Sequence, residues 1–147
     1  MYSDWLINVA VVVATMAAVC LCVLVHYEGL LFTSGRLVHL GGPPRVKVLY
    51  AIGSVLTLHV VEIWIFGLMF WLLLRLPEFG HLGPTALHLF DYIYFSSATY
   101  TTVGFGDLAP VGPIRFLAGT EGLTGFVMIT WSASFTYLEM ERFWRRS

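Results

Sequence analysis

The chain has 147 residues, of which 58% are hydrophobic and only 12% are charged. Its mean hydropathy of +0.79 excludes an ordinary water-soluble domain and indicates an integral membrane protein. The net charge of −1 does not point to any class of partner, and the sequence has no basic run that would suggest a nucleic-acid partner. At this length we expect a single domain with room for three membrane-spanning helices of about 20 residues each and one shorter element.

The first hydrophobic segment is expected to be a retained transmembrane helix. Its apolar run extends from about Trp5 to Val25. This run is too long and too evenly apolar for a signal peptide, and Asp4 stands where a basic region would be needed. We therefore assign residues 1–32 to an N-terminal transmembrane helix and residues 33–47 to a short cytoplasmic loop.

Residues 48–147 are predicted to hold two further spans on either side of a shorter helix. The expected elements are an outer helix over 48–76, a short helix over 87–100, a loop over 101–107 and an inner helix over 114–140. A helix of roughly 14 residues is too short to cross a hydrocarbon core of about 30 Å. The short helix should therefore enter the membrane and stop at the loop.

The loop reads Thr-Thr-Val-Gly-Phe-Gly-Asp from Thr101 to Asp107, and it follows an aromatic segment from Phe90 to Tyr100. This combination resembles the selectivity filter of the pore-loop potassium channels, whose loop has the form Thr-Val-Gly-Tyr-Gly. Phe105 stands where that family usually has Tyr. Glycines let consecutive carbonyl oxygens face one axis, where they replace the water shell of a cation. The resemblance covers about Val48 to Arg146, a two-span pore module of bacterial type, and the N-terminal helix has no counterpart in it.

The resemblance implies an all-α membrane protein with three transmembrane helices, a re-entrant pore helix and a filter loop. One loop per chain cannot enclose a cation, so a homotetramer around a central pore is expected. The implied function is passive, potassium-selective conduction, with no enzyme activity, no cofactor beyond the permeating ion and no soluble partner. Potassium would be bound by Thr102, Val103, Gly104 and Phe105, and Thr101 and Gly106 would complete the filter.

Two other functions are kept open. One is a non-conducting or accessory membrane subunit that retains the pore fold but is closed by Trp131. The other is a weakly selective cation channel, against which the intact Val-Gly-Phe-Gly sequence argues.

Three residues around the filter follow from the same resemblance. Tyr94 and Phe95 stand where many members of the family carry two tryptophans that brace the filter, so we expect a structural role for both. Asp107 at the outer mouth either concentrates cations or caps a turn, and the sequence does not decide between these roles.

The inner helix contains five candidates for pore lining or gating. By helical spacing, Thr124, Met128 and Trp131 are expected to line the pore, and Trp131 is either a constriction or a helix-interface residue. The resemblance places a hinge glycine at Gly125. Glu121 would attract cations, sense protons or bond to the back of the pore helix, and we favour the last role.

A polar cluster is predicted between the first two spans. His26 and Glu28 end the first span, whereas His59 and Glu62 share one face of the second. Polar contact between helices is the common use of such residues, and a proton switch or a divalent metal site are the alternatives. The second His of a zinc-protease helix is absent after His59, so hydrolase chemistry is not expected.

The basic residues predict the orientation. Arg36, Arg45 and Lys47 lie between the first two spans, and Arg142, Arg145 and Arg146 follow the third. Such residues favour the cytoplasmic side, so we expect a multi-pass protein of the cell (inner) membrane with its N-terminus outside and its C-terminus in the cytoplasm.

Overall fold

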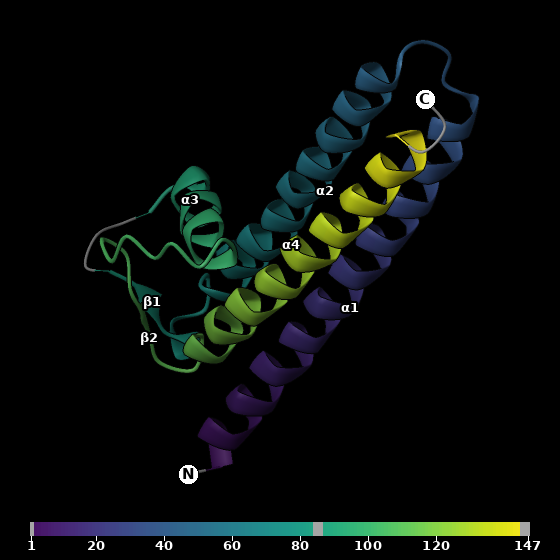
Figure 1. Cartoon of the computed structure of the whole chain (residues 1–147). Helices are drawn as coiled ribbons and strands as arrows, with labels where there is room; N and C mark the ends of the chain where they lie inside the picture. Colours follow the sequence, from purple (N-terminus) through teal and green to yellow (C-terminus); the bar gives the residue numbers. More distant parts are fainter. Residues whose placement is uncertain (1, 84–86, 145–147) are drawn as a thin grey trace.

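A computed structural model describes residues 2–83 and 87–144 and is built around three long helices (Figure 1). The long helices are α1 (Tyr2–His39), α2 (Pro44–Leu73) and α4 (Arg115–Trp144), and the short helix is α3 (Leu89–Tyr100). The connecting segments contain the 3-10 helix η1 (Pro77–Phe79) and two short strands, β1 (His81–Leu82) and β2 (Pro110–Val111).

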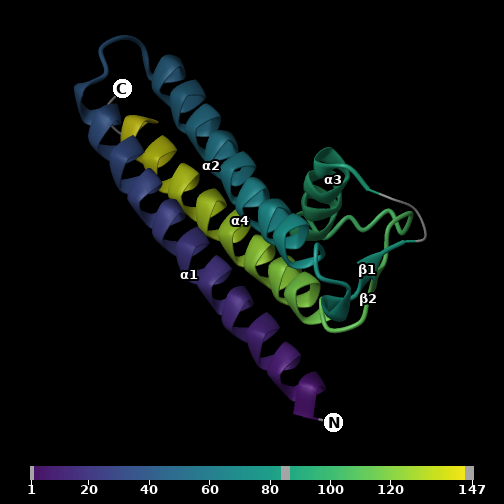
Figure 2. The same ribbon diagram turned by 180° about the vertical axis from the view of Figure 1, so that it is seen from behind.

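The long helices form a bundle in which α4 packs against both α1 and α2 (Figures 1 and 2). Both views place α3 and its neighbouring loops beside α2, on the side of the bundle away from α1. The N-terminus and the two strands lie toward one end of the bundle, and the connection from α1 to α2 lies at the other, near the end of α4.

Two of the described helices are long and apolar enough to cross a membrane by length and composition, namely Trp5–His39 within α1 and Pro44–Leu73. Helix α4 has the same length as α2, 30 residues. It contains more polar residues, however, and its composition alone does not identify it as a helix that could cross a membrane. The third predicted span therefore remains a prediction.

The loop between α1 and α2 is much shorter than the predicted range of 33–47. Helix α1 continues to His39, and α2 begins at Pro44. The apolar run ends before Arg36, but the helix does not, because its last turns still have a buried face. Thr33 and Leu37 are buried, and the Ser34 hydroxyl donates to Glu139 Oε1 of α4 at 3.0 Å. Packing thus extends the helix beyond its hydrophobic segment.

The position of α3 is fixed by a hydrophobic core shared with α2 and α4. The largest buried side chains of this core are Phe66 and Phe70 of α2, Phe95 and Tyr100 of α3, and Ile114 and Leu117 near the start of α4. The Phe70 and Phe95 rings meet edge to face with centroids 5.0 Å apart, which is a favourable aromatic geometry. Gly67 permits close approach, because a Cβ there would lie 3.0 Å from the Ile93 Cα.

The chain that leaves α2 is joined to the chain that enters α4. Strands β1 and β2 are antiparallel, with His81 opposite Val111 and Leu82 opposite Pro110. The Ile114 N–H also donates to the Phe79 carbonyl at 3.0 Å. The segment that contains α3 and the 101–107 loop is therefore closed at its base.

Candidate ion-binding loop and polar cluster

Helix α3 directs its C-terminal end toward the 101–107 loop. At its start, the His88 backbone N–H donates to Asp91 Oδ2 at 2.7 Å, so an acidic side chain satisfies a free donor near the positive end of the helix dipole. At its end, Thr101 is the C-cap, and its hydroxyl donates to the Ser97 carbonyl at 2.7 Å. The partial negative charge of the helix end is thereby presented at the first residue of the loop.

The loop backbone alternates between left-handed and other conformations. Thr102, Gly104 and Gly106 have φ values of +60°, +53° and +81°, whereas Val103 and Phe105 lie outside this region. Thr102 is the one non-glycine residue of the described chain with a positive φ, which costs about 1–2 kcal/mol for an L-residue. Alternation of this kind permits neighbouring carbonyls to face one direction.

The loop is uncovered in the single chain. All seven residues from 101 to 107 are exposed, including the apolar side chains of Val103 and Phe105, which are 58% and 70% exposed. The loop is nevertheless tied to the helix that precedes it, since the Gly104 N–H donates to the Ala98 carbonyl at 3.0 Å. The loop is thus fixed by a hydrogen bond to α3, while its outer side is not covered by any other part of the described chain.

Tyr94 contacts the loop from α3. Its hydroxyl donates to Asp107 Oδ2 at 2.9 Å, and its ring stacks on Phe105 with centroids 6.2 Å apart and planes within 8°. The hydrogen bond to Asp107 raises the pKa of Tyr94 above its usual value. Phe95, for which a structural role was also expected, turns into the core against Phe70, because successive residues of a helix point to different faces.

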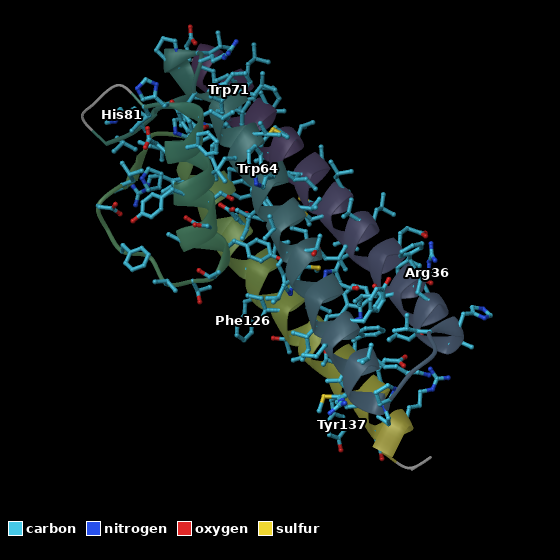
Figure 3. The ribbon with its side chains drawn as sticks, turned by 90° about the horizontal axis from the view of Figure 1, so that it is seen from above. Arg36, Trp64, Trp71, His81, Phe126 and Tyr137 are labelled. Carbon is cyan, nitrogen blue, oxygen red and sulfur yellow. The ribbon has the colours of Figure 1, made fainter. Side chains whose placement is uncertain are left out.

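The structure corrects the predicted pore-lining face of α4. Thr124 and Met128 are buried in the bundle, because α4 is covered by three helices rather than two. The exposed apolar residues of α4 are Phe116, Leu123, Phe126, Val127, Ile129, Trp131, Tyr137 and Leu138. Figure 3 shows Phe126 and Tyr137 projecting outward. Apart from Trp131, whose ring lies against α1, these residues form an outward face that, rather than that of Thr124 and Met128, is available to line a pore or contact another chain.

The other three candidates on α4, Glu121, Gly125 and Trp131, each contact a neighbouring helix. Glu121 is fully buried and accepts a hydrogen bond from the Ser96 hydroxyl of α3, which is the contact with the back of the pore helix favoured from the sequence. A Cβ on Gly125 would overlap the Tyr100 carbonyl oxygen, so α3 and α4 touch there. The Trp131 ring lies 5.0 Å from that of His26, at the interface with α1.

A buried polar cluster connects α1, α2 and α3. His26 Nδ1 lies 2.7 Å from Glu62 Oε1, and His59 Nδ1 lies 3.1 Å from Glu62 Oε2. The Tyr100 hydroxyl donates to Glu62 and also lies 3.0 Å from His59 Nδ1. The pairs predicted to meet between the helices therefore do so, except for Glu28.

Glu28 is not a member of the cluster, whereas two residues that were not predicted from the sequence are. Glu28 is exposed and has no hydrogen bond or ion pair with the residues that the structure describes. Tyr100 and Ser132 are the missed members; the Ser132 hydroxyl lies 3.4 Å from His26 Nε2. The position of Tyr100 as the last residue of a short buried helix was the available signal. Nothing in the pattern of α4 distinguished Ser132.

The fold and the loop together define a pore-loop ion channel. Residues 54–140 match the model of the Ion_trans_2 family, whose description is "Ion channel". Because this match covers more than half of the chain, the protein belongs to that ion-channel family. The matched segment begins within α2, so α1 lies outside it.

Two curated relatives share a shorter stretch of sequence. Protein LctB of Bacillus caldotenax is 42% identical over 38 residues, which are 26% of this chain and 28% of that protein. Protein LctB of Geobacillus stearothermophilus is 45% identical over 38 residues, with the same coverage. The alignment thus covers little more than a quarter of each relative's length. No solved structure matches the chain.

Proposed function

We propose that this protein is a potassium-selective channel that conducts passively across the cell (inner) membrane. The observation that carries the proposal is the 101–107 loop, in which Thr102, Gly104 and Gly106 are left-handed at the C-terminal end of a short buried-faced helix. Potassium would be coordinated by the carbonyls of Thr102 to Phe105, with no other cofactor in conduction. The negative end of the α3 dipole would favour the cation below the filter.

Four copies of the chain would complete the site. A single loop supplies one side of a coordination shell, and its exposure leaves it free to face three others. In this assembly the outward face of α4 would border the pore, with α4 as a third spanning helix. Its 30 residues give about 45 Å, enough for a core of about 30 Å.

The proposed orientation places the filter outside. Arg36, Arg45 and Lys47 lie on either side of the α1–α2 connection, at the end of the bundle away from β1 and β2 (Figure 1). Arg142 belongs to the same end, and Arg145 and Arg146 lie outside the described residues. A cytoplasmic location for these residues puts the N-terminus and the filter on the outer side.

The alternative of a closed accessory subunit depended on Trp131 as a plug. Trp131 packs against His26, and its ring centroid lies 6.4 Å from that of Tyr27, so no observation favours this alternative. A weakly selective channel would differ only in its permeability ratios.

The test is potassium and sodium flux into liposomes that contain the purified full-length protein, with barium as a blocker. We expect potassium flux well above sodium flux and inhibition of the potassium flux by barium. Equal fluxes would replace the proposal with the weakly selective channel. Absence of flux from an assembled tetramer would replace it with the accessory subunit.

A further inference from the structure

The polar cluster between the helices has the composition of a metal site. His26 comes from α1, His59 and Glu62 come from α2, and their potential ligand atoms all lie within 4.8 Å of one another. His26 and Glu62 are fully buried. Ionisable groups in a membrane-spanning helix are costly, and here Glu62 is the shared partner of both imidazoles.

We propose that His26, His59 and Glu62 bind a divalent transition-metal ion of the zinc class, which joins the N-terminal helix to the pore module. Imidazole nitrogens with one carboxylate oxygen are a ligand set that zinc accepts while keeping a fourth position open. The Tyr100 hydroxyl lies beside both Glu62 and His59 and therefore borders the proposed site. The inference goes beyond conduction and does not depend on it.

The distances from the two Nδ1 atoms to the Glu62 carboxylate can be compared with those that such an ion requires. Tetrahedral zinc with bonds of about 2.0–2.2 Å places neighbouring ligand atoms about 3.3–3.6 Å apart. The two Nδ1 to carboxylate distances are 2.7 Å and 3.1 Å. These two distances run to different oxygens of Glu62, Oε1 and Oε2, so the two imidazoles and the carboxylate would have to turn toward one ion, starting from ligand atoms that all lie within 4.8 Å of one another.

Metal binding would also determine which ring nitrogen of each histidine carries the proton. A metal ion takes the lone pair of Nδ1, so each neutral imidazole must carry its single proton on Nε2. For His26, the Ser132 hydroxyl lies 3.4 Å from Nε2 and can accept that proton's hydrogen bond. Such an outer partner fixes the tautomer and orientation of a ligating histidine. Ser132 is thus a positioning residue of the proposed site.

The cluster borders a groove on one side. The His59 side chain is 14% exposed, whereas those of His26 and Glu62 are fully covered. His59 and Ser132 line a groove of about 410 Å³ between α2 and α4, which also borders Val55, Leu56 and Thr136. Among the three proposed ligands, His59 is the one that lines this groove.

The test is direct zinc binding by the full-length protein, prepared without a polyhistidine tag and stripped with a chelator. Zn²⁺ alone is titrated by calorimetry, and bound zinc is counted by mass spectrometry after gel filtration. We expect one zinc per chain and a higher unfolding temperature when zinc is bound. His59→Gln and His26→Gln should weaken binding by more than about 100-fold, and Ser132→Ala by about 10-fold, the range measured for outer partners.

The matched control is His39→Gln, because His39 lies exposed in the last turn of α1, away from the cluster. It should bind zinc like the unaltered protein. Gly104→Ala should also keep its zinc, which separates this site from the filter. Less than stoichiometric zinc in the unaltered protein, or undiminished binding by a correctly eluting His59→Gln, would overturn the proposal.

Discussion

Gly104 has a left-handed backbone and open space around it, so a substitution there tests the backbone conformation of the filter separately from its packing. No atom of the described chain lies within 4 Å of the position that a Cβ would occupy, so within one chain alanine would meet a backbone penalty of about 1–2 kcal/mol and no steric overlap. We expect Gly104→Ala to abolish potassium flux in liposomes while the protein still assembles, as judged by gel filtration.

Gly53→Ala is the matched control for that variant. Gly53 also has open space around its Cβ position, but it lies inside α2 without a positive φ, where alanine is the better helix former. It should conduct like the unaltered protein. Undiminished potassium flux through the Gly104→Ala variant would show that the 101–107 loop is not the selectivity filter.

Tyr94 offers a residue-level test of filter bracing. Its pKa is raised by the hydrogen bond to Asp107, so this bond is present below the usual tyrosine pKa of about 10 and is lost as the pH rises through the raised value. Tyr94→Phe keeps the stacking on Phe105 and removes the bond. We expect lower steady potassium flux at neutral pH and no further alkaline loss in this variant.

The corresponding measurement is flux as a function of pH in liposomes of both proteins. The unaltered protein should lose flux only in strongly alkaline solution. If Tyr94→Phe matched it at every pH, the contact between Tyr94 and Asp107 would have no part in holding the filter.

At the scale of elements, the contact between α3 and α4 depends on Gly125. A methyl group there would overlap the Tyr100 carbonyl, which is backbone and cannot rotate away. We expect Gly125→Ala to destabilise the protein by about 1–3 kcal/mol, the usual cost of overpacking. Thermal unfolding in detergent measures this, with Gly35→Ala, at an open position in α1, as the control. Unchanged stability with altered opening would instead support Gly125 as a hinge.

Glu121 gives a second test of the same interface. Its Oε1 contacts the Ser96 hydroxyl, while its Oε2 is buried without a hydrogen-bond partner among the described atoms. Glu121→Gln keeps the volume and the oxygen that contacts Ser96, so we expect nearly unchanged thermal stability. Glu121→Ala should cost about 2–4 kcal/mol through the lost contact and the cavity. Equal losses in both variants would show that the charge itself is required.

The sequence was most informative where its signal was local. The filter and the short helix before it depend on adjacent residues from Phe90 to Asp107, and the helix lies within two residues of its predicted bounds. The inward face of α4 could not be predicted in this way, because apolar residues surround the helix and α1 adds an extra neighbour. Thr124 and Met128 were misplaced for that reason. The length of α1 was underestimated because its last turns are held by packing rather than by hydropathy.

At the scale of the whole molecule, the exposed surface predicts assembly. The filter loop and the outward face of α4 leave many large apolar side chains uncovered in one chain. Some must face lipid, but a carbonyl ring also requires symmetry-related copies. We expect native mass spectrometry to give four times the chain mass of 16.5 kDa. A monomer that still conducts would contradict the central four-fold pore.

The pairing of β1 with β2 provides one connection through which a force can pass between α2 and α4. Because it joins the chain after α2 to the chain before α4, a force that separates the ends of these helices also acts on the pairs of His81 with Val111 and Leu82 with Pro110. The bond from Ile114 to Phe79 shares this load. The filter segment is therefore closed at its base, and because α3 packs against α2 at Phe70 and against α4 at Gly125, a shift of either helix would also act on the segment directly.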